Sequence, residues 1–192
     1  MKYMYSLNTS LETHNIFYEK AKESYRKIFN RVGIGDKTYL TLASGGSFSA
    51  QSDEFQTICE AGEDTIFITD EAKKNAVNKE VENRQETGHK AVEVGNIFNL
   101  GTKFSDPYLK FKNEKGKDQP VYMGSYGLGP ARLMGTMVEI LSDEKGMIWP
   151  TEVAPFRVHL LAIPRSTLGI AEEVYKTLQA QNIEVLYDDR DV

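Results

Sequence analysis

The sequence predicts an α+β fold: an antiparallel sheet within residues 36–128, flanked by helices at 11–31 and 130–141, and then a partial α/β domain. Three patterns predict this arrangement. An amphipathic helical stretch stands near the start, turn residues divide the middle into short strand-like segments, and a β-α-β pattern comes last. A length of 192 residues is enough for one domain or two small ones.

The first helix is indicated by apolar residues that recur at three- and four-residue steps between residues 11 and 31. They are Ile16, Phe17, Ala21, Tyr25, Ile28 and Phe29. Strands are expected at 38–43, 55–60 and 65–69, because each is an apolar or alternating segment bounded by turn residues. Residues 61–64 have the composition of a hairpin-type connection between the last two strands.

The next segment, residues 70–90, is strongly polar and predicts a solvated connector or a short surface helix. Further strands are expected at 92–98, 103–108 and 120–123, because these segments are again apolar or alternating. Residues 113–118 are polar and predict the tip of a hairpin.

The last part of the chain indicates a second domain. Residues 158–163 are a continuous apolar strand of the buried, parallel kind. A helix at 167–181 and a strand at 183–187 complete one β-α-β unit, which cannot cover both faces of its own sheet. We therefore expect a first domain at 1–150 and an incomplete second domain at 151–192.

Composition narrows the class of protein. Of the residues, 40% are hydrophobic and 27% are charged, as in ordinary globular proteins. The apolar run 158–163 is far too short to span a membrane, and the charged start excludes a signal peptide, so we expect a cytoplasmic protein without a membrane partner. Cys59 has no companion for a disulfide or a structural zinc, and no metal site is expected. The net charge of −5 argues against indiscriminate nucleic-acid binding but permits a local groove for one RNA.

The motif with the most chemical information runs Gly124-Ser-Tyr-Gly-Leu-Gly-Pro-Ala-Arg132, which predicts a glycine-rich turn at 124–129 that opens the helix at 130–141. It is not a P-loop, because no Gly-Lys-Ser/Thr follows, and not the dinucleotide fingerprint, because Arg132 stands where the third glycine is required. Glycines let a ligand approach the backbone, and an arginine at a helix start favours phosphate. From the motif alone, a structural glycine turn with a surface arginine remains equally open.

Residues 124–132 resemble motif 3 of the class II aminoacyl-tRNA synthetases, and residues 1–6 resemble the tail of motif 2. Further stretches resemble the prolyl-tRNA synthetases in particular, in that family's order. They are SGGSFS at 44–49, SDEFQ at 52–56, EAGEDT at 60–65, VEVGNIFNLGTKFS at 92–105, DEKGMIWP at 143–150 and VAPF at 153–156. The resemblance covers nearly all of the chain, and several ordered matches are more specific than any single motif.

The resemblance to prolyl-tRNA synthetases implies a class II catalytic domain followed by the start of an anticodon-binding domain. It implies a ligase of protein biosynthesis that uses ATP to attach proline to its tRNA through prolyl-adenylate. ATP and Mg²⁺ would be its cofactors, and L-proline and tRNA(Pro) its other partners. The full-length family would act as a homodimer.

Carried over position by position, the resemblance implies two groups of site residues. Arg132 would be the catalytic residue that holds the ATP γ-phosphate, and the other ATP-binding positions are Glu93, Asn96, Gly127 and Gly129. The proline-binding positions are Asp53, Glu54, Phe98 and Ser125. Two structural interpretations stay open: Phe98 as an ordinary core aromatic, and Glu93 as a solvated carboxylate on a strand where Val92 and Val94 point the other way.

The sequence departs from the family pattern in several places. Asp53 replaces the usual histidine with a carboxylate, and Tyr3 stands where an acidic residue is usual. The editing domain of many bacterial prolyl enzymes has no counterpart, because only residues 70–91 fill that gap, so hydrolysis of mischarged alanyl-tRNA is not expected in cis.

Motif 1 and the body of motif 2 are also absent. We therefore expect a fragment that forms no prolyl-adenylate at a useful rate by itself, and whose exposed strand edges favour self-association. The alternative is a catalytically inactive paralogue or fragment that binds tRNA or a synthetase.

Overall fold

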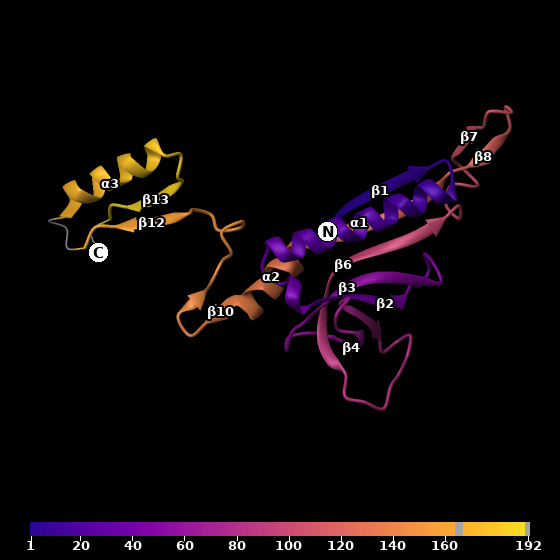
Figure 1. Cartoon of the computed structure of the whole chain (residues 1–192), viewed down its shortest axis with the longest axis horizontal. Helices are drawn as coiled ribbons and strands as arrows, with labels where there is room; N and C mark the ends of the chain where they lie inside the picture. The colour runs from indigo at the N-terminus through magenta and orange to yellow at the C-terminus, as the bar shows by residue number, and fades with distance from the viewer. Residues whose placement is uncertain (164–166, 191–192) are drawn as a thin grey trace. The chain divides into compact units, whose positions relative to one another are not determined.

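The computed structural model describes residues 1–163 and 167–190, which form two compact units, Met1–Ile148 and Trp149–Val192 (Figure 1). The first unit ends two residues before the boundary expected from the sequence. Among the described helices, none is both long and apolar enough to cross a membrane.

The first unit is built on a seven-stranded sheet with the order β1-β9-β6-β3-β2-β5-β4. Its strands are β1 (Lys2–Asn8), β2 (Thr38–Ser44), β3 (Gln51–Ile58), β4 (Asp64–Asp70), β5 (Asn75–Asn78), β6 (His89–Gly101) and β9 (Tyr122–Leu128). All neighbours are antiparallel except β2 and β5, which are parallel. The predicted α+β fold with a largely antiparallel sheet is confirmed.

One end of this sheet closes on itself. β4 pairs with β6 as well as with β5, so that β6, β3, β2, β5 and β4 form a ring of strands. A small apolar core fills the ring and consists of Tyr39, Ile66, Ala76 and Ala91, with Ile58 and Ile68 packed against it. At the other end of the sheet, β1 is the free edge among the described strands.

Helix α1 (Leu11–Arg31) covers one face of the sheet (Figure 1). It begins after Ser10, whose hydroxyl accepts a hydrogen bond from the Thr13 backbone N–H at 3.2 Å and so satisfies a free helix donor. Tyr25 stacks on Phe55 of β3 with ring centroids 5.0 Å apart. Ile16, which the sequence pattern includes in the apolar stripe, is 64% exposed instead.

The buried face of α1 is carried by His14, Tyr18, Ala21, Tyr25 and Phe29, at spacings of three and four residues. The short helix η1 (Gly35–Lys37) follows and leads into β2.

The polar segment 70–90 is neither a simple connector nor a helix. Its middle forms β5, where Ala76, Val77 and Asn78 are buried between β2 and β4. A four-residue strand is too short to show a periodicity, and the charged residues on both sides of it hide the two apolar positions.

β3 and β4 do not form the expected hairpin across residues 61–64. Both pair instead with β6, whose 13 residues are long enough to serve each of them. Ala91 of β6 lies opposite Ile58 of β3 on one side and Asp64 of β4 on the other. Residues 61–64 therefore lead the chain from one side of β6 to the other, and β3 and β4 do not pair with each other.

Residues 103–108 form turns rather than a strand. The Asp106 backbone N–H donates to the Thr102 carbonyl at 2.9 Å, and the Leu109 N–H donates to the Ser105 carbonyl at 2.7 Å. The hairpin with its polar tip is confirmed as β7 (Lys110–Lys112) and β8 (Asp118–Pro120).

The expected glycine-rich turn is a strand for most of its length. β9 runs through residue 128 and pairs with β1 on one side and β6 on the other. Glycine is needed here because neighbouring side chains leave no room for a Cβ atom. A Cβ on Gly124 would stand 2.4 Å from the Tyr126 hydroxyl oxygen. α2 (Pro130–Leu141) then begins after Gly129, with Pro130 in its first turn.

The unit ends with a small hairpin of β10 (Ser142–Asp143) and β11 (Gly146–Met147).

The second unit contains β12 (Val158–Leu161), α3 (Leu168–Ala180) and β13 (Val185–Asp188). The two strands are parallel, as the β-α-β pattern predicts. Tyr175 of α3 stacks on Tyr187 of β13 with ring centroids 5.3 Å apart. The strands are not buried as expected, because Leu161 and Leu186 are each 43% exposed. Residues 164–166, between β12 and α3, lie outside the described part.

Candidate functional site

The candidate site lies on the sheet face opposite α1. Side chains alternate along a strand, and Phe55 packs on α1, so its neighbours Glu54 and Gln56 point to the other face. The same alternation applies to β6. A Cβ on Gly95 would meet the Tyr25 ring of α1 at 2.8 Å, which leaves Asn96 and Phe98 on the open face.

A β-bulge at Val94 brings Glu93 to this face as well. The register between β3 and β6 shifts between Phe55 and Gln56, so that Val94 has no partner on β3. In a regular strand, residues three positions apart point to opposite faces. Because of the bulge, the Asn96 Nδ2 donates to the Glu93 Oε1 at 2.8 Å.

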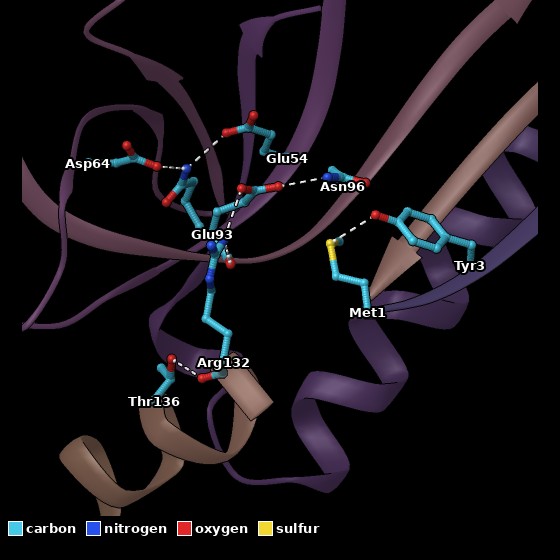
Figure 2. Close-up of polar contacts among 9 residues, drawn as sticks. Met1, Tyr3, Glu54, Asp64, Glu93, Asn96, Arg132 and Thr136 are labelled. Atoms are coloured by element: carbon cyan, nitrogen blue, oxygen red, sulfur yellow. Dashed lines mark hydrogen bonds and ion pairs between the residues drawn. The ribbon is translucent and has the colours of Figure 1, made fainter. Parts of the chain in front are cut away.

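Arg132 reaches from the first turn of α2 to Glu93 (Figure 2). Its Nη1 donates to the Glu93 carbonyl oxygen at 2.9 Å and to the Glu93 Oε2 at 3.0 Å. The Arg132 side chain is 51% exposed, so this ion pair is of modest strength. The guanidinium is fixed at the open face yet accessible to an anion from solvent.

The two predicted ATP-binding glycines lie beside this group. A Cβ on Gly127 would stand 2.4 Å from the Asn96 Oδ1, so a larger residue would push that amide aside. Gly129 donates its backbone N–H to the Val94 carbonyl at 3.2 Å and precedes α2. A hollow of about 180 Å³ lies between Gly129, Arg132 and Glu93.

A second cavity, of about 360 Å³, is lined in part by Asn96, whose side chain hydrogen-bonds to Glu93 in the wall of the first hollow. Five aromatic side chains line it: Tyr3, Tyr5, Phe48, Phe98 and Phe104. The Phe48 ring centroid is 5.5 Å from that of Phe98 and 6.4 Å from that of Phe104. Ser125 lies opposite Phe98 in the pairing of β9 with β6 and supplies a hydroxyl. We call this space the aromatic cavity.

The segment that carries Phe48 is held over the aromatic cavity by Lys103. The Lys103 Nζ donates to the Ser47 carbonyl at 2.6 Å and lies 5.4 Å from the centre of the Phe104 ring. The turn at residues 103–108, which was expected to be a strand, therefore positions a second wall of the cavity.

Glu54 lies on the same face, among other carboxylates. The Gln56 Nε2 donates to the Glu54 Oε2 at 2.8 Å and to the Asp64 Oδ2 at 2.6 Å (Figure 2). Burial raises the pKa of Glu54 to about 7; the hydrogen bond from Gln56 acts against this rise, and the Glu93 carboxylate adds to it. Glu54 is thus a carboxyl group that changes charge near neutral pH.

Asp53 is the one predicted site residue that the structure does not bring to this face. The Asp53 Oδ2 pairs with the Lys22 Nζ at 2.8 Å and accepts a hydrogen bond from the Tyr18 hydroxyl at 3.0 Å, and both partners belong to α1. The reason is the alternation of the strand: Glu54 points to the open face, so its neighbour Asp53 must point to the helix.

Several residues of the site were not expected from the sequence. Phe48, Phe104, Tyr5 and Gln56 stand in stretches that resemble the family, but no pattern marks them individually. Tyr3 was noted only as a departure from the family pattern. Among the described residues, no cluster of three or more His, Cys, Asp or Glu side chains could hold a metal ion.

Comparisons with known proteins identify the relatives of the chain. No protein-family model matches it. It is 36% identical to the proline–tRNA ligase of Rickettsia canadensis (strain McKiel) in an alignment of 220 residues that covers 100% of this chain and 50% of that protein. It is 33% identical to the proline–tRNA ligase of Neorickettsia sennetsu, in an alignment that covers 98% of this chain and 50% of that protein. The chain is a homologue of proline–tRNA ligases.

The chain spans about half the length of the curated relatives it matches. The proline–tRNA ligase of Wolbachia pipientis wMel is 32% identical, with 98% of this chain and 49% of that protein covered. The fold agrees with this relationship. A crystal structure of prolyl-tRNA synthetase from Cryptosporidium parvum, complexed with L-proline and AMP, superposes with a TM-score of 0.69 at 18% identity over 98% of this chain and 35% of that chain. The class II synthetase-like fold is confirmed.

Proposed function

We propose that the first unit binds ATP and L-proline and carries part of the active site of a proline–tRNA ligase. The homology to proline–tRNA ligases supports the reaction class, and the synthetase-like fold supports the placement of the site on the open sheet face. One observation carries the proposal: a cationic hollow at Arg132 and the aromatic cavity are linked by a hydrogen bond between Glu93, which lines the hollow, and Asn96, which lines the cavity. A nucleotide and a small apolar amino acid fit two such neighbouring sites.

Arg132 is proposed to hold the terminal phosphate of ATP. Its fork of donors matches a pair of phosphate oxygens, and its ion pair with Glu93 is exposed enough to be exchanged for a stronger one. The Asn96 Oδ1 is buried and has no hydrogen-bond partner among the described residues, so it can accept a bond from the ligand. Gly127 keeps the space beside that amide open.

The aromatic cavity is proposed to hold the pyrrolidine ring of proline. Phe98 and Phe48 offer an apolar surface, and the faces of aromatic rings attract the protonated ring nitrogen. Ser125 supplies a hydrogen-bonding group at the base of the cavity. Glu54, on the same sheet face, supplies a carboxylate above its pKa of about 7. Asp53 does not take part, because it is bonded to α1.

The residues fit a magnesium ion that arrives with the nucleotide. Mg²⁺ is held in such sites mainly by phosphates and water, with one or two carboxylates, and Glu93 lies beside the proposed phosphate site. When bound, the ion would neutralise charge on the departing pyrophosphate. Glu93 would then exchange its ion pair with Arg132 for a contact with the magnesium ion.

The proposed chemistry has two steps and needs no protein nucleophile. A carboxylate oxygen of proline bonds to the α-phosphorus of ATP, and the bond from that phosphorus to the bridging oxygen breaks, which releases pyrophosphate. The terminal ribose hydroxyl of tRNA(Pro) then bonds to the prolyl carbonyl carbon, and AMP leaves. Arg132 and the aromatic cavity contribute by orienting the reactants and by stabilising charge.

For the second unit, we propose a role in binding the anticodon part of the tRNA, as the resemblance implies. A homodimer and a cytoplasmic location also remain predictions. The alternative function is a catalytically inactive module that binds tRNA or a synthetase. Robust proline-dependent ATP–pyrophosphate exchange by this chain would exclude the inactive module and would contradict the expectation that the chain alone forms no prolyl-adenylate at a useful rate.

Calorimetric titrations with a non-hydrolysable ATP analogue and with a non-hydrolysable prolyl-adenylate analogue test the two parts of the proposed site. Arg132→Ala is expected to weaken binding of the ATP analogue by roughly 10- to 100-fold, because charge-assisted hydrogen bonds to the terminal phosphate are lost. Phe98→Ala is expected to weaken binding of the prolyl-adenylate analogue by about tenfold through lost apolar contact. Arg26→Ala, an equal charge change on α1, is the matched control and should bind like the wild type. Equal affinity of the Arg132 and Arg26 variants would contradict the proposal.

A further inference from the structure

Two of the five aromatic side chains that line the aromatic cavity are not carried by the sheet. The other three stand on β1 and β6, whose positions are fixed by strand pairing. Phe48 lies instead in the loop at residues 45–50, between β2 and β3, and Phe104 lies in the turn at residues 102–109. The width of the cavity therefore depends on how firmly these two segments are held.

The loop at residues 45–50 closes on itself rather than on the sheet. The backbone N–H groups of Phe48 and Ser49 both donate to the Gly45 carbonyl, at 3.0 and 3.3 Å. Gly46 follows with a φ of +54°, and a Cβ at that position would meet nothing within 4 Å. Glycine loses more conformational freedom on ordering than any other residue. A loop of this kind needs a contact from outside to keep one position.

Lys103 supplies that contact. Among the described residues, it makes the one hydrogen-bonding contact that the loop receives from beyond residues 44–51. The Lys103 Nζ donates to the Ser47 carbonyl at 2.6 Å and to the Phe48 carbonyl at 3.4 Å. The same ammonium group lies 5.4 Å from the centre of the Phe104 ring, as a cation–π contact. One side chain thus joins both segments that lie outside the sheet.

The turn that carries Lys103 is itself fixed to the sheet. The Ser105 side chain is completely buried, and its hydroxyl donates to the carbonyl oxygen of Val121, directly before β9. The Asp106 backbone N–H closes the turn by donating to the Thr102 carbonyl at 2.9 Å. The support therefore runs from the sheet through the turn to the loop, and Lys103 is its last link.

We propose that Lys103 is a positioning residue that sets the affinity and the ring-size preference of the aromatic cavity by holding Phe48. This inference rests on the proposed function, in which the cavity holds the pyrrolidine ring of proline. The ring centroids of Phe48 and Phe98 are 5.5 Å apart, so Phe48 packs directly on the floor of the cavity and limits its width. While Lys103 holds this wall, a larger ligand ring must push it aside. Without Lys103, the wall can move and adapt.

Calorimetric titration with two non-hydrolysable adenylate analogues tests the positioning role. One carries the proline ring and the other the six-membered ring of L-pipecolic acid, so the nucleotide part is the same in both. Lys103→Met keeps most of the apolar stem and removes the ammonium group. It is expected to weaken binding of the prolyl analogue by about 5- to 10-fold. The preference for the five-membered ring should fall by about threefold or more, because a movable wall accommodates the added methylene.

Two further variants control this measurement. Lys103→Arg keeps a charged donor and is expected to retain most of the affinity and the ring-size preference, which a general loss of structure would not allow. Lys117→Met makes the same exchange at an exposed position between β7 and β8 and should bind both analogues like the wild type. If the wild type binds both analogues and Lys103→Met keeps the same affinities, the positioning role is wrong while the proposed function stands. If the wild type binds neither analogue, the proposed function fails and this inference fails with it.

Hydrogen exchange of the free chain tests the hold on the loop without any ligand. The backbone N–H groups of Phe48 and Ser49 are expected to exchange about threefold or more faster in Lys103→Met than in the wild type, because the loop opens more often. The amides of β9 should be unchanged, and Lys117→Met should exchange like the wild type at every position. Equal exchange of the loop amides in all three proteins would show that Lys103 does not hold the loop and would overturn the inference.

Discussion

Glu54 is a carboxyl group whose charge changes near neutral pH, because burial raises its pKa from 4.5 to about 7. Between these two values the folded chain binds a proton that the unfolded chain releases. Folding stability therefore falls as the pH rises through this window and levels off above pH 7. Below pH 4.5 both states are protonated, and the advantage of the folded state is fully present.

Urea denaturation at pH 5 and pH 8 measures this effect. The wild type is expected to lose stability on the order of 2 kcal/mol more than Glu54→Gln between the two pH values. The variant keeps the shape of the side chain and an acceptor for the Gln56 amide. If both proteins lose the same stability, Glu54 is ionised in the fold at neutral pH and its assigned environment is wrong.

Asp53 illustrates how a single residue can share a sequence motif with a site and yet serve the opposite face. Asp53→Ala removes the acceptor of both Lys22 and Tyr18 and is expected to lower the free energy of unfolding by about 1–2 kcal/mol. Affinity for the prolyl-adenylate analogue should stay within about twofold of the wild type. A loss of affinity without a loss of stability would place Asp53 at the ligand.

At the scale of elements, β9 and α2 contain two glycines with opposite roles. Gly127→Ala drives a Cβ into the Asn96 amide and is expected to weaken binding of the analogue by about tenfold. Gly135 in α2 has open space around its Cβ position, so Gly135→Ala should raise the free energy of unfolding by ~1 kcal/mol and leave binding unchanged. Calorimetry and urea denaturation of both variants check this contrast. If Gly127→Ala left binding of the analogue unchanged and Gly135→Ala weakened it, Gly127 would have no part in the site.

Regular elements with local signals were predictable from the sequence. The helix α1 has an N-capping serine and a repeated apolar spacing, and α2 has Pro130 in its first turn. The glycine-rich part of β9 was mistaken for a turn because glycine is rare in strands. Glycine is required in this strand because the Tyr126 and Asn96 side chains occupy the space where Cβ atoms of Gly124 and Gly127 would stand. No local sequence pattern reveals these contacts.

The site itself was partly predictable. Glu93, which the resemblance assigns to ATP binding, contacts two other such positions, Asn96 and Arg132, and the contact with Asn96 depends on the bulge at Val94, a change of one residue in strand register. Bulges arise from pairing with another strand, and the glycine next to this one, Gly95, does not by itself show which residue is left unpaired. For the same reason, the Phe48 and Phe104 walls of the aromatic cavity could be found only after folding.

At the scale of the whole molecule, the closing of the sheet was not predictable. It depends on β4 pairing with β6, and on the hidden strand β5, which joins β4 to β2 on the other side of the ring. Residues 70–91 are thus built into the ring and connect its strands directly.

The most direct test of the account is a crystal structure of this chain with L-proline and a non-hydrolysable ATP analogue. The account predicts that both ligands lie on the sheet face opposite α1, with the proline ring against Phe98 and the terminal phosphate at Arg132. Ligands bound in other cavities, or an Arg132 side chain turned away from the terminal phosphate, would contradict it.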